Sequence, residues 1–435
     1  MKQLLKGQFR RQVGATFITQ LIGLVFSIST AAIVARWLGP EGKGMLAMAL
    51  LVPGMMVIFL NSGIGVANVY FAASKRMNVP TLTNNSVIFA LLATTLGTGL
   101  IVVLIASGWL EVFLPGVPVW FILVAIIGLP IGLLSGFFTT ILQGLQSIMT
   151  INVINLTQGG LTLALTFLLV VSLKIGLLGS LIAYLGASIL GLIVLTLVLR
   201  SAGGVFIPKW NPKIVRSTLS FGLKGHIGNI LQFFNYRLDM FIVNYFLGPN
   251  DVGIYSISVG LAELLWHFPN AVGFVIFPKA ASTKPEVMNI FTPRVFRITL
   301  GLTALGAVGL IFLGKPIIAF VYSSPFLPAY VPMLALLPGV VLLGSAKVLT
   351  NEIAGRGYPH YNSINAGLAL ILTVVLDLIL IPRYGVLGAA LASSISYAVI
   401  FFLAIGFYLA VSRRKEELSK LQTAAERWDV SAPTY

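Results

Sequence analysis

Long apolar stretches separated by short polar segments dominate this sequence. Runs such as 13–35 and 86–107 contain no ionisable side chain. A stretch of about 20 apolar residues is long enough to cross a bilayer as a helix. The pattern predicts twelve spans, at residues 12–35, 44–72, 82–107, 118–141, 150–172, 177–199, 217–246, 252–278, 295–321, 330–352, 361–381 and 386–411. Their length favours helices over the roughly ten-residue alternating strands of a membrane barrel, which predicts an all-α polytopic membrane protein.

Composition and the placement of charge support this class. The chain has 435 residues, of which 57% are hydrophobic and 9% charged, whereas about a quarter are charged in a soluble protein. The net charge is +16, and twenty of the 28 Lys and Arg residues fall in segments on the side of the N-terminus, against five in the opposite loops. Positive residues concentrate on the cytoplasmic side of membrane proteins. We therefore expect a multi-pass protein of the cell (inner or plasma) membrane with both termini cytoplasmic, and no nucleic-acid partner.

The polar segments divide the chain into five parts. Residues 1–11 form a basic amphipathic N-terminus, 201–216 a cytoplasmic linker and 412–435 a cytoplasmic tail. Two bundles of six helices are expected at 12–200 and 217–411. The chain contains no Cys and only three dispersed His, so neither a disulfide nor a metal site is predicted.

An internal repeat relates the two bundles. The segment "WLGPEGKGM" at 37–45 recurs as "FLGPNDVGI" at 246–254, and the same offset of 209 residues carries "KIGLLG" at 174–179 onto "RYGVLG" at 383–388. Six crossings return the chain to its starting side, so the two bundles have the same orientation. A duplication of this kind predicts a pseudo-twofold axis along the membrane normal, with the substrate path at the interface of the bundles.

These motifs resemble the polysaccharide-transporter family, the lipid-linked oligosaccharide (O-antigen-type) flippases. The resemblance rests on the two Leu-Gly-Pro turns and on three further segments, "YRLDMFIVNYFLGPNDVGIYSIS" at 236–258, "LQGLQ" at 142–146 and "DLILIPRYGVLGAA" at 377–390. It implies a multidrug-and-toxin-extrusion-like fold that moves a polyprenyl-diphosphate oligosaccharide from the inner to the outer leaflet by alternating access, for cell-surface polysaccharide (lipopolysaccharide) biosynthesis. It also implies membrane lipid as a partner, with polysaccharide polymerase and export machinery as candidates.

Comparison of the two copies helps to identify candidate site residues. A charged residue that is present in only one copy is not required by the fold that both copies share, so it is a candidate for function. Ionisable residues lie inside the spans of the second copy only, and each costs on the order of 3 kcal/mol unless it is paired or hydrated. A water-filled cavity facing the second half would explain them. The candidates for its lining are Arg237, Asp239, Lys224, His226 and Lys347, with the neutral Gln20, Asn61 and Asn68 in the first half.

Each candidate has a structural alternative. Arg237 suits a diphosphate, since its fork matches phosphate oxygens, but it could instead form an ion pair with Asp239. Lys224 and His226 could lie among lipid headgroups, and Lys347 faces the cavity or the protein. The amides Gln20, Asn61 and Asn68 could contact sugar hydroxyls, although hydrogen bonding between helices is the commoner use of such residues.

Three further residues are candidates for ion coupling. Glu263 and His267 are one helical turn apart and could exchange protons near neutral pH, or simply satisfy each other. Asp377 is the third candidate, unless it extends outward toward the membrane surface near Arg383. A proton or sodium gradient is the expected driving force, and no cofactor is predicted.

Two other functions compete with the flippase. A cation-coupled multidrug exporter of amphipathic molecules would favour acidic and aromatic linings, whereas this chain offers Lys224, Arg237 and Lys347. A membrane glycan ligase or polymerase needs a large outer catalytic loop, and the outer loops at 108–117 and 322–329 are short. A scaffold without transport activity would leave the buried charges unexplained. We therefore expect a transporter and not an enzyme.

Overall fold

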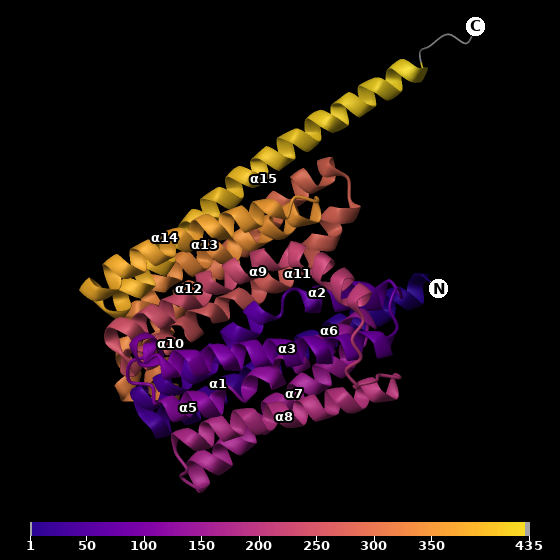
Figure 1. Ribbon diagram of the computed structural model, residues 1–435. Coiled ribbons are helices and arrows are strands. Elements are labelled where there is room, and N and C mark those ends of the chain that lie inside the picture. The colour runs from indigo at the N-terminus through magenta and orange to yellow at the C-terminus, as the bar shows by residue number, and fades with distance from the viewer. Residues whose placement is uncertain (1, 431–435) are drawn as a thin grey trace. The chain divides into compact units, whose positions relative to one another are not determined.

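The computed structural model describes the backbone of residues 2–430 and the side chains of residues 18–412 except 224, 225, 274 and 282. Within that range the chain is helical and contains no strand (Figure 1). The helices that precede the linker are α1 (Lys2–Leu60), α2 (Ile64–Ala73), α3 (Val79–Ala106), α4 (Trp109–Phe113), α5 (Val119–Ala125), α6 (Gly128–Gly144), α7 (Ile148–Thr166) with a π-helical end (Phe167–Ser172), and α8 (Leu177–Ser201).

The helices that follow the linker begin with α9. They are α9 (Pro212–Leu247), α10 (Pro249–Glu263), a short 3₁₀ segment (Leu264–Trp266), α11 (His267–Ser282), α12 (Pro285–Ile317) with a π-helical end (Ile318–Tyr322), a 3₁₀ segment (Ser324–Ala329), α13 (Tyr330–Gly355), α14 (His360–Tyr384) and α15 (Val386–Val430). The predicted tail thus continues the last span as one helix, and residues 431–435 lie outside the described range. The side chains of the predicted amphipathic segment 1–11 also lie outside it.

Most of the chain consists of helices that are long enough to span a membrane. Ten helical stretches are long and apolar enough to cross a membrane. The first of them, Ile18–Leu60, covers most of the first predicted span and the beginning of the second, whose remainder is the separate helix α2. The charged helix α9 is not among the ten. Dividing the first stretch at Gly39 and adding α9 recovers the twelve predicted spans, so the prediction of an all-helical polytopic protein is confirmed.

The Leu-Gly-Pro motif is a reversal that takes a single residue. Gly39 has φ 68° and ψ −174°, and Gly248 has φ 85° and ψ −179°. That region is open essentially to glycine alone. The proline that follows, Pro40 or Pro249, occupies the first turn of the next helix, where its fixed φ suits the helix and its missing N–H costs no hydrogen bond.

A second pair of repeated glycines adopts matching conformations. Gly176 has φ 71° and ψ −139°, and Gly385, at the same offset of 209 residues, has φ 61° and ψ −142°. The two copies therefore share backbone conformations at both ends of the repeat. This is what a duplication predicts.

Residues that pack together form two compact units. Unit 1 consists of Met1–Phe233, Val243–Ile254 and Ala319–Phe326. Its central helix is α6, which contacts α2, α3 and α8. Phe137, Phe138 and Ile141 of α6 are buried in the core of unit 1.

Unit 2 consists of Phe234–Ile242, Tyr255–Ile318 and Leu327–Tyr435. Its central helix is α13, which contacts α11, α12 and α15. Met333, Ala346 and Ile353 on α13 are fully buried. Helix α9 contributes to both units, since its middle segment 234–242 packs in unit 2 and the flanking segments pack in unit 1.

Candidate functional site

The middle of α9 carries the principal candidate residues. Asn211 caps the start of this helix by accepting hydrogen bonds from the backbone N–H groups of Lys213 and Ile214, which is a preferred role of Asn. More than six turns later, α9 presents Asn235, Arg237 and Asp239 within unit 2.

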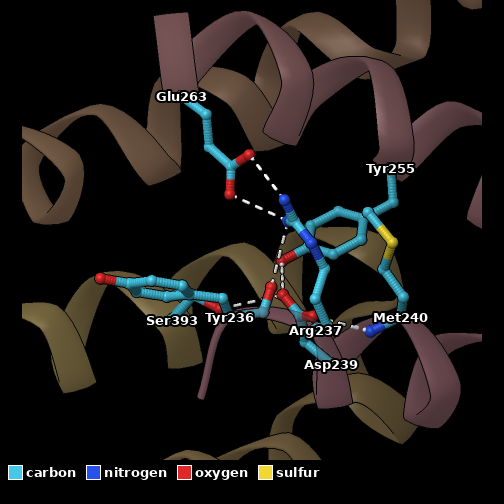
Figure 2. Close-up of polar contacts among 7 residues, drawn as sticks. All are labelled: Tyr236, Arg237, Asp239, Met240, Tyr255, Glu263 and Ser393. Carbon is cyan, nitrogen blue, oxygen red and sulfur yellow. Dashed lines mark hydrogen bonds and ion pairs between the residues drawn. The ribbon is translucent and has the colours of Figure 1, made fainter. Parts of the chain in front are cut away.

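Arg237 is paired with Glu263 of α10. Its two Nη atoms donate to the two carboxylate oxygens of Glu263 at 2.9 Å each, and Figure 2 shows the guanidinium facing this carboxylate end-on. The Arg237 and Glu263 side chains are 29% and 21% exposed. The bidentate pair satisfies the fork of Arg237, so the alternative of a direct Arg237–Asp239 ion pair is wrong for this structure.

The expected contact between Glu263 and His267 is also replaced. Both carboxylate oxygens of Glu263 bind Arg237, and the His267 side chain is exposed. A 3₁₀ segment, Leu264–Trp266, separates the two residues. Each 3₁₀ residue turns the chain by about 120° rather than about 100°, which rotates His267 away from the face that carries Glu263.

Asp239 is buried and held by hydroxyl groups instead of a cation. The side chain is 2% exposed. Its Oδ2 accepts hydrogen bonds from Tyr255 Oη at 2.6 Å and from Ser393 Oγ at 3.3 Å, and its Oδ1 accepts one from the Met240 N–H at 2.8 Å (Figure 2). Asp239 thereby connects α9 to α10 and α15.

Asp377 of α14 does not extend outward toward the membrane surface, contrary to the expectation. It is 0% exposed, and neither carboxylate oxygen has a hydrogen-bond partner among the described residues. Four residues earlier on the same helix, Thr373 donates to Asn235 Oδ1 at 2.8 Å. The sequence could not decide this point, because the hydrophobic pattern around Asp377 does not indicate which helices pack against the face that carries it.

Asp377 and Asp239 belong to one polar cluster in the core of unit 2. The two carboxylates are close enough to interact electrostatically. Asn235 and Asp239 are four residues apart on α9, as Thr373 and Asp377 are on α14, so each pair lies along one helix face. The cluster has a further polar atom that could bind a ligand, because Asn235 Nδ2 also has no hydrogen-bond partner among the described residues. Two carboxylates with amide and hydroxyl oxygens suit a proton or a small hard cation.

Lys347 of α13 lies on an aromatic surface in the same unit. Its Nζ donates to Asn270 Oδ1 at 2.9 Å and lies 4.1 Å from the centre of the Trp266 ring. Tyr236, Trp266 and Tyr397 pack against one another, with ring centres 5.1–6.1 Å apart. An ammonium over such rings gains a cation–π attraction.

The aromatic residues of this site are absent from the predicted set. Tyr236, Tyr255 and Trp266 were overlooked because only charged and amide side chains were compared between the repeats. The same comparison could have found them, because subtracting 209 puts the non-aromatic Ser27, Leu46 and Val57 opposite them.

The other predicted residues belong to unit 1. His226 is buried, with Nε2 3.4 Å from the Phe59 carbonyl oxygen. Asn68 is fully buried and donates to Ser86 Oγ at 3.0 Å, and Asn61 accepts from the Gly65 N–H at 3.3 Å. The bond from Asn68 links α2 to α3, as the structural alternative for the amides predicts. The bond of Asn61 is local to the start of α2, and His226 is buried within the protein.

The last two of the predicted lining residues make no described contact. Gln20 is exposed on α1. The Lys224 side chain lies outside the described residues.

A second ion pair stabilises the opposite end of unit 2. Arg356 bonds Glu352 one turn earlier on α13 and donates to Asn289 Oδ1 on α12 at 2.8 Å. Both charged side chains are almost fully buried, at 3% and 0% exposure. Among the described residues, no group of three or more His, Asp or Glu is placed to hold a metal ion.

The fold is that of transporters that move lipids or drugs. A structure of the lipid II flippase MurJ in an inward closed conformation superimposes with a TM-score of 0.70 at 19% identity, covering 97% of this chain and 93% of that one. An inward-facing multidrug resistance MATE transporter gives a TM-score of 0.73 at 16% identity, covering 92% and 96%.

The sequence also identifies the family. The chain belongs to the polysaccharide biosynthesis protein family, whose model matches residues 9–284. The probable low-salt glycan biosynthesis flippase Agl15 of Haloferax volcanii is 26% identical over 198 residues, which cover 43% of this chain and 40% of that protein. The chain spans about two fifths of the length of the first curated relatives it matches.

Proposed function

We propose that this protein is a flippase that moves a polyprenyl-diphosphate-linked oligosaccharide from the inner to the outer leaflet by alternating access. Membership of the polysaccharide biosynthesis family supports the glycan class of substrate. The similarity to a probable glycan flippase and the transporter fold support translocation rather than synthesis.

The observation that carries the proposal is a partly exposed pair of cations within membrane-spanning helices of unit 2. Arg237 keeps 29% of its side chain exposed while it binds Glu263, and Lys347 uses one of its three N–H donors on Asn270. A diphosphate that exchanges with Glu263 replaces one anion by another, so Arg237 is never left unpaired at membrane depth. Lys347 has donors left for the second phosphate.

The test is lipid analysis of a host that lacks the protein. We expect a polyprenyl-diphosphate oligosaccharide to accumulate on the cytoplasmic leaflet, as measured by mass spectrometry together with a leaflet-specific label. The wild-type chain should reverse the accumulation and Arg237→Ala should not. Arg383→Ala, which removes an exposed arginine outside the cluster, is the matched control. Absence of accumulation would refute the flippase.

The polar core of unit 2 supports a coupling role for Asp377 and Asp239. A carboxylate with two unpartnered oxygens beside a second carboxylate favours binding of a proton or sodium ion at one stage of the cycle. Binding would neutralise Asp377 and release when the site opens would recharge it, so the two states of the transporter differ in cation affinity.

A cation-coupled multidrug exporter is the second candidate. The aromatic surface of Tyr236, Trp266 and Tyr397 favours it, because amphipathic cations bind aromatic faces. The discriminating outcome is sensitivity to cationic dyes in the host that lacks the protein, without any accumulated lipid-linked glycan.

The proposal also covers the orientation of the chain in the membrane and its protein partners. The charge distribution supports cytoplasmic N- and C-termini in the cell membrane. A polysaccharide polymerase that takes up the translocated glycan and the export machinery beyond it are the partners we propose. Gln20 and Lys224 remain candidates for the path of the headgroup.

A further inference from the structure

The two Leu-Gly-Pro turns contact each other within unit 1. A Cβ atom built on Gly44 would lie 1.7 Å from the carbonyl oxygen of Pro249, and one built on Gly253 would lie 1.9 Å from the carbonyl oxygen of Pro40. No side chain fits at either distance. Glycine is therefore required at 44 and 253 by space, whereas Gly39 and Gly248 are required by backbone conformation.

The contact is self-complementary. Gly253 is the repeat equivalent of Gly44, and Pro249 is the equivalent of Pro40. Each glycine therefore contacts the proline of the other turn: Gly44 contacts Pro249, and Gly253 contacts Pro40. An isologous contact of this kind forms where two copies meet across a local twofold axis.

Polar contacts flank the turns in the same reciprocal manner. At the end of the first span, Arg36 Nε donates to the Val321 carbonyl at 2.9 Å and Arg36 Nη2 donates to the Phe320 carbonyl. At the end of the seventh span, Asn244 Nδ2 donates to the Pro115 carbonyl at 3.2 Å. The first helix of each copy therefore donates to a backbone carbonyl of the other copy, in the π-helical end of α12 for Arg36 and in the loop before α5 for Asn244.

We propose that these contacts form the gate that closes the transporter on its outer side, with Gly44 and Gly253 as the positioning residues. The proposal rests on the proposed function, because a gate has meaning only for alternating access, and on the predicted orientation, which places both turns outside. Opening outward would separate two glycine-proline backbones and release hydrogen bonds to carbonyls, which water can replace. The repeated motif is then kept in both copies because each copy forms half of the gate.

A cross-linking experiment tests the gate without altering the glycines. The chain has no native Cys, so Pro115→Cys with Asn244→Cys can be joined by a short cleavable bis-thiol reagent added outside. We expect cross-linking to stop translocation of the lipid-linked glycan and cleavage of the reagent to restore it. Translocation that continues at the uncross-linked rate in fully cross-linked protein would overturn the proposal.

Glycine variants supply the second arm. Gly44→Ala and Gly253→Ala in the double-cysteine chain should lower the cross-linking yield, on the order of tenfold if the closed state loses its majority. Gly54→Ala and Gly260→Ala are matched controls on α1 and α10, since nothing lies within 4 Å of a Cβ at either position. An unchanged yield in folded Gly44→Ala protein, judged by its thermal unfolding, would also overturn the gate.

The two proposals fail in different ways. If the cross-linking yield responds to the glycine variants as described but no lipid-linked glycan moves in wild-type protein, the gate stands and the substrate is wrong. If the glycan moves but neither cross-linking nor the glycine variants affect it, the flippase stands and the gate is wrong.

Discussion

Asp377→Asn is the substitution that most directly tests the polar core of unit 2. Asp377 is 0% exposed, and neither carboxylate oxygen has a hydrogen-bond partner among the described residues. At a pH high enough to ionise Asp377, removal of its charge relieves the cost of desolvation and the repulsion from Asp239. The Asn amide still lacks partners, so we expect a net stabilisation of the cation-free protein of about 1–3 kcal/mol.

The ligand dependence should change in the opposite direction. A cation that binds only the folded wild type stabilises it by about 2.7 kcal/mol at a hundredfold excess over its dissociation constant. Asp377→Asn should lose this increment. At saturating cation the variant is therefore no more stable than wild type, although it is more stable without cation.

The assay is thermal unfolding of purified protein in nanodiscs, with sodium replaced by choline at constant ionic strength and then repeated at several pH values. A dependence on sodium at fixed pH identifies sodium as the ligand, and a dependence on pH alone identifies the proton. Glu111→Gln, which removes an exposed carboxylate on α4, controls for the change in net charge. Equal sodium and pH dependence in Asp377→Asn and wild type would refute the assignment.

Three further substitutions test other contacts. Glu263→Gln should free the guanidinium of Arg237 and strengthen its binding of inorganic pyrophosphate, measured by calorimetry. The same substitution should lower stability by on the order of 1–3 kcal/mol, because the ion pair is only partly exposed. Weaker pyrophosphate binding would contradict the exchange of anions. Gly248→Ala should destabilise the protein by about 1–3 kcal/mol in denaturant unfolding, because its backbone conformation is strained for any other residue, whereas Gly260→Ala should not. Asn68→Ala should lower stability by about 1–3 kcal/mol through loss of buried hydrogen bonds without changing cation dependence, and a changed cation dependence would instead place it in the transport path.

The sequence was sufficient for the fold because its signals are long and local. Apolar runs of spanning length predict helices from composition alone, and the offset of 209 residues predicts the repeated turn that Gly39 and Gly248 form. The same comparison of copies selected α9 as the helix that carries the principal candidate residues. These inferences need no knowledge of which helices are neighbours.

The partners within the site could not be predicted in this way. Glu263 was expected to meet His267 on its own helix and instead binds Arg237 of α9, since a 3₁₀ segment changes the local register. Asp377 was a candidate for ion coupling with an outward position as the alternative, and its distance along the chain from Arg383 could not decide between the two. Contacts between helices depend on packing, which periodicity does not encode.

The discontinuous make-up of unit 1 has a consequence for biogenesis. Its last piece is Ala319–Phe326, and the carbonyls that Arg36 binds lie in that piece. The ribosome must therefore translate roughly three quarters of the message, and α12 must enter the bilayer, before the first helix acquires its final contacts. Until then Arg36, at the end of the first span, lacks its partners in the nascent chain. A chain truncated before residue 319 therefore lacks the last piece of unit 1.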